Sequence, residues 1–126
     1  MSKENINFGK SGEEAAVSFL RKNGYRIIAR NYRTRLGEID IIASEKGEIC
    51  FVEVKTRNSD AFGLPAEAIT GPKRRQISKC ALLYLKENNL MEKEARFDVV
   101  SVMFSDGKQE IEIIKDAFEL EGEYAV

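Results

Sequence analysis

The chain has 126 residues, of which 43% are hydrophobic and 33% charged, and its net charge is −1, which together suit one globular domain with its own core. The near-neutral charge argues against a protein that coats nucleic acid through charge alone, and no apolar run reaches the roughly 20 residues that span a bilayer. The sequence contains no histidine, which excludes histidine-dependent zinc sites, triads and general bases, so that hydrolysis would depend on carboxylates, Lys, Tyr, Ser, Thr or Cys together with a metal ion.

The N-terminal half predicts one helix followed by three strands. The helix is expected over residues 11–23, where Ser11 and Glu14 form a capping box and Asn23-Gly24 marks the end. Runs rich in β-branched and aromatic residues, separated by turn residues, predict the strands. Their expected ranges are 25–33, 37–43 and 49–56, with a turn at 44–47.

The C-terminal half predicts a loop at 57–71, a second helix over 72–89, and two more strands over 96–104 and 109–114 that turn at Asp106-Gly107. The apolar stripe of this helix consists of Ile77, Ala81, Tyr84 and Leu85. The order α-β-β-β-α-β-β predicts an α/β fold in which helices flank a mixed central β-sheet. We expect one domain over residues 1–126.

Two further features bear on where the protein works. Cys50 and Cys80 are expected to be reduced and buried, because they have no CxxC spacing and free Cys packs as a small hydrophobe. The polar start Met1-Ser2-Lys3-Glu4-Asn5 lacks the apolar core of a signal peptide. We therefore expect a cytoplasmic protein.

Acidic residues interrupt two of the predicted strands. Asp40 lies within Ile39-Asp40-Ile41-Ile42, and Glu53 and Lys55 lie within Phe51-Val52-Glu53-Val54-Lys55. Strict alternation and a four-residue turn would put Asp40 and Glu53 on one face, about 5–8 Å apart at Cβ. Two carboxylates so close repel unless a cation lies between them, and Mg²⁺ prefers one or two carboxylates with a phosphate oxygen. A solvent-facing amphipathic strand remains the alternative.

Glu13 is a third candidate acid. Helical spacing puts it on the stripe of Ala16, Val17 and Leu20 that should meet the sheet. Its place in the first turn of the predicted helix, where the helix dipole favours an anion, explains it equally well.

One cluster of basic residues begins the second predicted helix. Lys73, Arg74 and Arg75 follow Pro72, and exposed cations there oppose the helix dipole, whereas a docked phosphate would reverse the effect. A solvated basic face is the alternative.

A second basic cluster, Arg30, Arg33 and Arg35, surrounds Tyr32. Such a pattern suits backbone contacts and base stacking, although a charge cluster at a strand end is equally ordinary. The loop 60–65 follows Lys55 closely, and either an active-site flap or a plain connection fits it.

These motifs together resemble the YraN-like family of uncharacterised bacterial proteins, which look like nucleases related to Holliday-junction resolvases. The resemblance covers nearly the whole chain. Its motifs are Gly9-x-x-Gly12-Glu13-x-x-Ala16, Gly24-Tyr25, Arg30-Asn31-Tyr32-Arg33, Gly37-Glu38-Ile39-Asp40-Ile41-Ile42-Ala43, Phe51-Val52-Glu53-Val54-Lys55-Thr56-Arg57, Phe62-Gly63, Lys73-Arg74-Arg75 and Arg96-Phe97-Asp98-Val99-Val100.

The resemblance implies a restriction-endonuclease-like fold with a PD-(D/E)xK site. By that implication Asp40 and Glu53 are metal ligands, Lys55 is the catalytic lysine and Glu13 completes the metal shell. Ile39 stands where the motif has its proline. The residues expected to contact nucleic acid are Arg30, Arg33, Arg35, Arg57, Lys73, Arg74 and Arg75.

We therefore expect a nucleic-acid-binding protein, a Mg²⁺- or Mn²⁺-dependent endonuclease that hydrolyses branched, flapped or single-stranded DNA in repair or recombination. The alternative is a non-catalytic module that binds nucleic acid or a protein partner and retains the nuclease fold. The sequence leaves a homodimer open.

Overall fold

The computed structural model describes residues 3–58 and 69–120, with side chains from Ser11 onward in the first helix. Its elements follow the order predicted from the sequence, with two helices and five strands in this part of the chain. They are α1 (Lys3–Lys22), β1 (Arg26–Thr34), β2 (Gly37–Glu45), β3 (Glu48–Asn58), α2 (Gly71–Glu87), β4 (Ala95–Ser105) and β5 (Lys108–Phe118).

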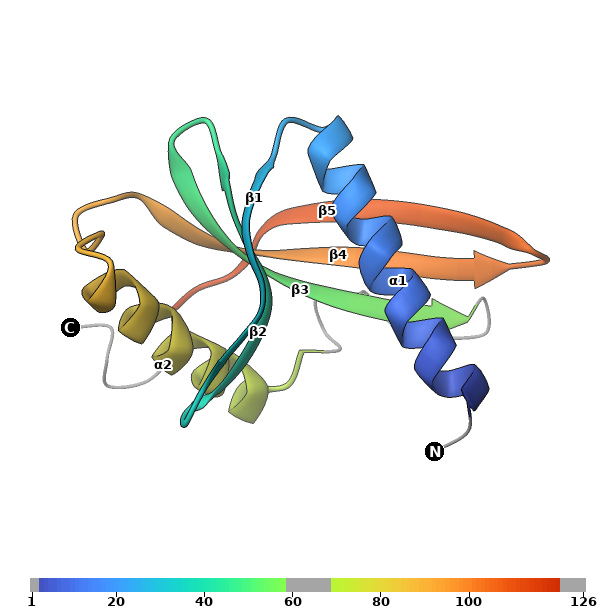
Figure 1. Cartoon of the computed structure of the whole chain (residues 1–126), viewed down its shortest axis with the longest axis horizontal. Helices are drawn as coiled ribbons and strands as arrows, with labels where there is room; N and C mark the ends of the chain where they lie inside the picture. The colour runs from blue at the N-terminus through green and yellow to red at the C-terminus, as the bar shows by residue number, and fades with distance from the viewer. Residues whose placement is uncertain (1–2, 59–68, 121–126) are drawn as a thin grey trace.

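The five strands form one mixed sheet in the order β1-β2-β3-β4-β5. All neighbours are antiparallel except β3 and β4, which are parallel. A parallel pair requires a crossover, and the connection that contains α2 provides it. Figure 1 shows α1 lying across β3, β4 and β5, whereas α2 lies beside β2. The predicted mixed α/β architecture is thus confirmed.

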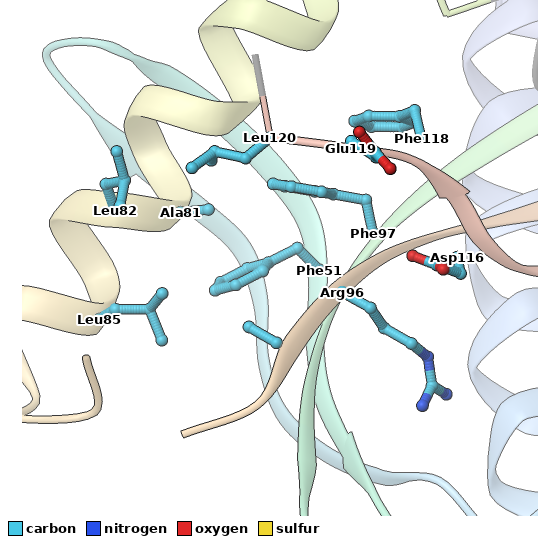
Figure 2. Close-up of a pocket in the computed structure, with 11 residues that line it drawn as sticks. Phe51, Ala81, Leu82, Leu85, Arg96, Phe97, Asp116, Phe118, Glu119 and Leu120 are labelled. Carbon is cyan, nitrogen blue, oxygen red and sulfur yellow. The ribbon is translucent and has the colours of Figure 1, made fainter. Parts of the chain in front are cut away.

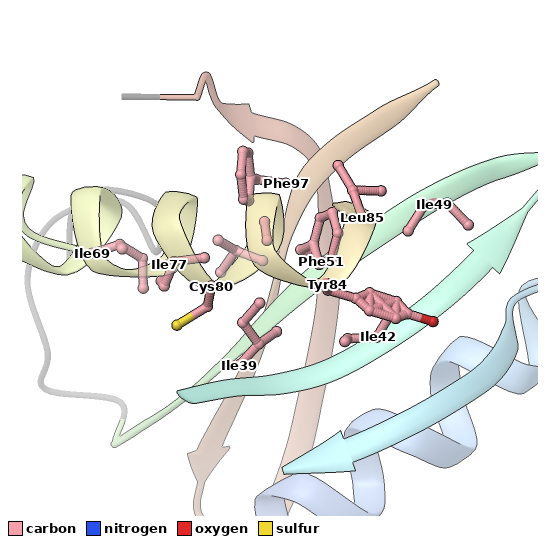
Figure 3. Close-up of a cluster of buried hydrophobic side chains, with 12 residues drawn as sticks. Ile39, Ile42, Ile49, Phe51, Ile69, Ile77, Cys80, Tyr84, Leu85 and Phe97 are labelled. Carbon is pink, nitrogen blue, oxygen red and sulfur yellow. The ribbon is translucent and has the colours of Figure 1, made fainter. Parts of the chain in front are cut away.

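Each helix covers its own buried cluster. The stripe predicted on α2 is buried against aromatic residues and two isoleucines of β2 (Figure 3), which are Phe51, Phe97, Ile39 and Ile42. On α1, the stripe of Ala16, Val17 and Leu20 is buried against Val52 and its neighbours in β4. Neighbouring residues of β3 belong to opposite clusters, as the period of two along a strand requires.

An aromatic cluster closes the α2 side near the start of β4. Figure 2 shows Phe51, Phe97 and Phe118 around an apolar cavity of about 240 Å³ beneath α2. The Phe97 and Phe118 rings are stacked with their centroids 4.8 Å apart. This stacking fixes the end of β5 against β4.

A buried ionic network around Arg96 lies near the start of β4. Arg96 donates to Asp98 (3.0 Å), to Glu45 (2.6 Å) and to the Tyr25 hydroxyl (3.1 Å), and it also pairs with Glu48. The Tyr25 hydroxyl in turn donates to Asp98, whose side chain has no solvent exposure. A charge buried this deeply needs such partners, so the network fixes the ends of β2, β3 and β4 relative to one another.

Boundaries predicted from the sequence are wrong at three places, one of which is the end of β5, expected at residue 114 and found at Phe118. Helix α1 begins at Lys3, so Ser11 lies inside it and does not cap it. The capping-box spacing misleads here because residues three apart are also ordinary neighbours within a helix. The hairpin turn is Lys46-Gly47, with φ values of 50° and 84°, because β2 continues to Glu45, where Arg96 holds its side chain. The predicted flap at 60–65 lies outside the described residues.

The expectation for the two cysteines is confirmed. Cys50 and Cys80 are free, buried thiols. Burial raises the pKa of the Cys50 thiol to about 12, which leaves it protonated and unreactive at neutral pH. Within residues 3–58 and 69–120, no helix has the length and apolar character needed to cross a membrane.

Candidate active site

The candidate site lies where β2 and β3 stop pairing through their backbones. Their regular register reaches Ile41 and Val52. Beyond this point, the side-chain carboxylates of Asp40 and Glu53 accept hydrogen bonds from backbone amides of the opposite strand. The Asp40 amide donates to Glu53 Oε2 (3.2 Å), and the Val54 amide donates to Asp40 Oδ2 (2.9 Å). The two predicted acids are therefore brought together.

The strict alternation expected along β2 does not hold at this point. Ile39 and Ile42, three residues apart, both belong to the cluster under α2, whereas Ile41 belongs to the cluster under α1 (Figure 3). Glu38, Asp40 and Ile42 therefore do not follow one regular face. The physical reason is that the Asp40 carboxylate takes the place of a backbone acceptor opposite Val54, which interrupts the period of two.

Burial makes both carboxylates reluctant to ionise. Glu53 is only 4% exposed, and burial together with the charge of Asp40 raises the pKa of Glu53 to about 8. Burial likewise raises the pKa of Asp40, against the opposing charges of Lys73 and Lys55. Desolvation and a like charge are the two effects that shift an acid in this direction. Both acids are therefore harder to ionise than exposed carboxyl groups, and a bound cation would favour their charged forms.

Lysines reach this pair from two elements. Lys55 follows Glu53 by two residues on β3, where it pairs with Ser101 of β4, and its charge acts on Asp40. Lys73 comes from the first turn of α2, and its Nζ lies 3.9 Å from Glu53 Oε1. From the sequence Lys73 was expected only to contact nucleic acid. Its place beside Glu53 depends on the α2 crossover, so no local signal indicated it.

Helix α1 approaches the site closely. A β-carbon on Gly12 would collide with Thr56 Oγ1, so the absence of a side chain there lets α1 lie directly on β3 beside Lys55. The next residue, Glu13, is half-buried, and burial and the charge of Asp40 raise its pKa. With its amide nitrogen turned toward the acids, Asn31 donates to Glu13 (3.2 Å) and Glu38 (3.1 Å).

Asp40 and Glu53 each have one carboxylate oxygen that could bind a divalent cation. One oxygen of each carboxylate is held by a backbone amide. Asp40 Oδ1 and Glu53 Oε1 have no hydrogen bond among the described residues, and Oε1 faces only the Lys73 ammonium. Mg²⁺ commonly uses one or two carboxylates, with waters and phosphate oxygens completing six positions. Among the residues with described side chains, no group of three acids is already arranged as a metal cluster.

A basic groove of about 490 Å³ begins beside this site. It runs between α2 and the β1–β2 turn, and its lining residues are Arg35, Leu36, Pro72, Lys73, Arg75, Gln76 and Lys79. Gln76 packs over Gly37, whose φ of 145° and lack of a side chain permit that contact. The groove therefore depends on tertiary packing between the turn and the helix.

The seven basic residues expected to contact nucleic acid divide into three groups. Arg35, Lys73 and Arg75 line the basic groove. Arg30 is paired with Glu14 (2.7 Å) and Arg33 with Glu38 (3.5 Å).

The remaining two lie elsewhere. Arg74 donates to the Ile69 carbonyl (2.7 Å), and Arg57 lies near the end of β3, opposite Met103. The groove residues Gln76 and Lys79 were missed, although their spacing from Pro72 and Arg75 puts all four on one helical face.

A family model described as "Uncharacterised protein family UPF0102" matches residues 12–102. A "UPF0102 protein" of Syntrophus aciditrophicus is 50% identical over 117 residues, covering 93% of this chain and 92% of that protein. Similar proteins of the same description occur in Pelobacter propionicus, at 50% identity over 93% of this chain and 86% of that protein, and in Geobacter metallireducens, at 48% identity over 95% and 98%. These matches confirm the family resemblance noted in the sequence.

A solved structure, the crystal structure of SSO0001, aligns with 93% of this chain at 18% identity and a TM-score of 0.41. The chain spans 55% of that protein's length. A similarity at this level carries no argument about this chain.

Proposed function

The chain belongs to the uncharacterised protein family UPF0102, and we propose that it is a metal-dependent endonuclease that hydrolyses phosphodiester bonds of nucleic acid. The observation that carries this proposal is the pair of buried carboxylates, Asp40 and Glu53, held by each other's strands beside two lysines and the basic groove. Acids in this position are costly without a cation, and a cation that binds them would meet a phosphate that follows the groove.

Each residue has a distinct role in this reaction. Asp40 Oδ1 and Glu53 Oε1 would hold Mg²⁺ or Mn²⁺, while the two backbone amide bonds keep their carboxylates in place. The ion, when bound, supplies polarisation of the phosphate and lowers the pKa of water. The Lys55 ammonium orients the attacking water or stabilises the charge that develops on the phosphate. Glu13 was expected to complete the metal shell; its charge interacts with that of Asp40, but among the described side chains it does not form a three-acid cluster with the pair, so we assign it an electrostatic role beside the site.

The groove favours recognition of the nucleic acid backbone. Four of its seven lining residues, Arg35, Lys73, Arg75 and Lys79, are cationic, and none is aromatic. Cations contact phosphates whatever the sequence, whereas base stacking requires aromatic rings. We therefore propose binding with little sequence preference, and we keep branched, flapped or single-stranded DNA, the substrates expected from the sequence, as the ones to test.

The test is cleavage of a panel of labelled duplex, flapped, branched and single-stranded oligonucleotides in Mg²⁺ or Mn²⁺. Cleavage should be lost in Asp40→Asn and in Lys55→Ala. Matched controls are Glu112→Gln and Lys108→Ala, which remove the same groups from exposed positions on β5 and should cleave like the wild type.

One observation favours the non-catalytic alternative: Lys73 already neutralises part of the acidic pair, as it would in a site that holds no metal. Binding of the panel without cleavage in either metal would establish that alternative. Equal cleavage by the wild type and Asp40→Asn would reject the assigned site.

A further inference from the structure

Lys73 belongs to two environments at once. Its Nζ lies 3.9 Å from Glu53 Oε1, and its side chain, 42% exposed, also lines the basic groove. The distance to Glu53 is too long for a hydrogen bond, so the contact is a charge attraction between a half-exposed ammonium and a buried carboxylate. Such a contact can be exchanged for another anion without a change in the fold.

The start of α2 makes Lys73 dependent on an anion from outside the helix. Positive charge in the first turn opposes the helix dipole, and the first turn of α2 contains no acidic residue. The Glu53 carboxylate lies within its reach and the charge of Lys73 also acts on Asp40; a phosphate bound in the groove that Lys73 lines would be a further anion. Arg74, the next residue of the helix, has its guanidinium directed to the Ile69 carbonyl, to which it donates a hydrogen bond.

We propose that Lys73 is an exchangeable counter-ion that couples metal binding to nucleic acid binding. In the metal-free protein its ammonium lies beside Glu53 and favours the ionised form of that buried acid. When a divalent cation occupies Asp40 and Glu53, it displaces the ammonium, which then pairs with a phosphate in the groove. This inference rests on the proposed function, and it makes Lys73 a positioning residue that acts through Glu53 and the backbone of the substrate.

The coupling has a definite sign. Lys73 and the metal compete for Glu53, so removing the Lys73 charge should tighten metal binding in the absence of nucleic acid. In the wild type, metal should tighten nucleic acid binding by releasing Lys73. Reciprocity of linked equilibria requires nucleic acid to tighten metal binding by the same factor, which is commonly about 5- to 150-fold.

The first experiment measures Mn²⁺ binding without nucleic acid by isothermal titration. Lys73→Gln should bind Mn²⁺ about tenfold more tightly than the wild type, a change within the usual range of such coupling. Arg75→Gln is the matched control, because it removes one charge from the same groove and turn of α2, and its Mn²⁺ affinity should stay near the wild-type value. Lys73→Arg, which keeps the charge, should also stay near the wild type.

The second experiment measures binding of a labelled oligonucleotide in EDTA and in Ca²⁺. Ca²⁺ should tighten binding by the wild type and by Arg75→Gln by a similar factor, although Arg75→Gln binds more weakly in both conditions. In Lys73→Gln this gain should be smaller than in the wild type and in Arg75→Gln, because only the direct contact between the metal and the phosphate remains; an equal gain in all three proteins would reject the coupling. A variant that lost its fold would be recognised by its circular dichroism spectrum, and Lys73→Arg would then provide the comparison.

The outcomes separate this inference from the proposed function. If the wild type binds Mn²⁺ and Lys73→Gln binds it no more tightly, the coupling is rejected while the metal site stands. If neither protein binds Mn²⁺, both proposals are rejected. Binding of Mn²⁺ by Lys73→Gln alone would support the inference, since Lys73 would then be the group that excludes the ion.

Discussion

The carboxylates of Asp40 and Glu53 face each other at the point where β2 and β3 separate, each held by a backbone amide of the opposite strand, at 3.2 Å for Glu53 Oε2 and 2.9 Å for Asp40 Oδ2. Because the amide bonds fix the two carboxyl groups close together in a buried place, the charge of Asp40 raises the pKa of Glu53. Four predictions follow from this pair and from the elements that position it.

Replacing Glu53 with Gln should stabilise the metal-free protein. Burial disfavours the charged carboxylate, whereas an amide of the same shape carries no charge. We expect the free energy of unfolding at neutral pH to rise by about 1–2 kcal/mol, measured by urea denaturation in EDTA. Glu112→Gln, at an exposed position, should change it by less than about 0.5 kcal/mol. A destabilised Glu53→Gln protein would show that the carboxylate contributes to stability.

The stability of the protein should fall as the pH rises, because the pKa of Glu53 is higher in the folded protein than in the unfolded chain. The folded protein retains a proton on Glu53 up to about pH 8, whereas the unfolded chain releases it near 4.5. The stabilisation is therefore greatest below the unfolded value and is lost as the pH rises through about 8. Denaturation curves between these pH values should show this loss in the wild type and a smaller one in Glu53→Gln. Parallel curves would contradict the assignment.

Replacing Gly12 with Ala should disturb the site, because the added β-carbon would occupy the space that Thr56 fills. In most helix interiors Gly→Ala is stabilising by about 1 kcal/mol. Here the added carbon would collide with Thr56, and we expect a loss of roughly 1–3 kcal/mol in the free energy of unfolding, with weaker Mn²⁺ binding as α1 moves off β3. Ser18→Ala, on the exposed side of α1, is the control and should not lose stability. A gain in stability for Gly12→Ala would exclude the close approach.

The ionic network around Arg96 should control stability without controlling metal binding. Asp98→Asn leaves Arg96 with one buried anion fewer, and breaking a buried pair costs about 3–5 kcal/mol. We expect a loss at the lower end of that range, because Glu45 and Glu48 still pair with Arg96. Calorimetry would measure the stability of the variant. Titration with Mn²⁺ below the melting temperature would measure its metal affinity. A changed Mn²⁺ affinity in the folded variant would link the network to the site.

The order of elements could be predicted because each signal is local. The apolar stripe on α2 was predicted from the helical period of 3.6 residues, and the structure buries it. The turn at Asp106-Gly107 was predicted from residues that tolerate a left-handed backbone, and both have positive φ values. Local signals failed where a distant residue decides. Glu45 remains in β2 because Arg96, fifty-one positions away, holds its side chain.

The sequence by itself determined that Asp40 and Glu53 come together, because a hairpin turn of four residues makes them diagonal neighbours, and the observed two-residue turn shifts the pairing by two positions and makes them direct neighbours. It could not determine the interrupted alternation at Asp40, the Lys73 ammonium beside Glu53, or the groove that joins them. Those depend on a crossover that carries α2 back to the sheet. The reason is physical: the pairing of two strands in a hairpin is set by the turn between them, whereas the charge around a buried carboxylate is set by whichever element packs against it.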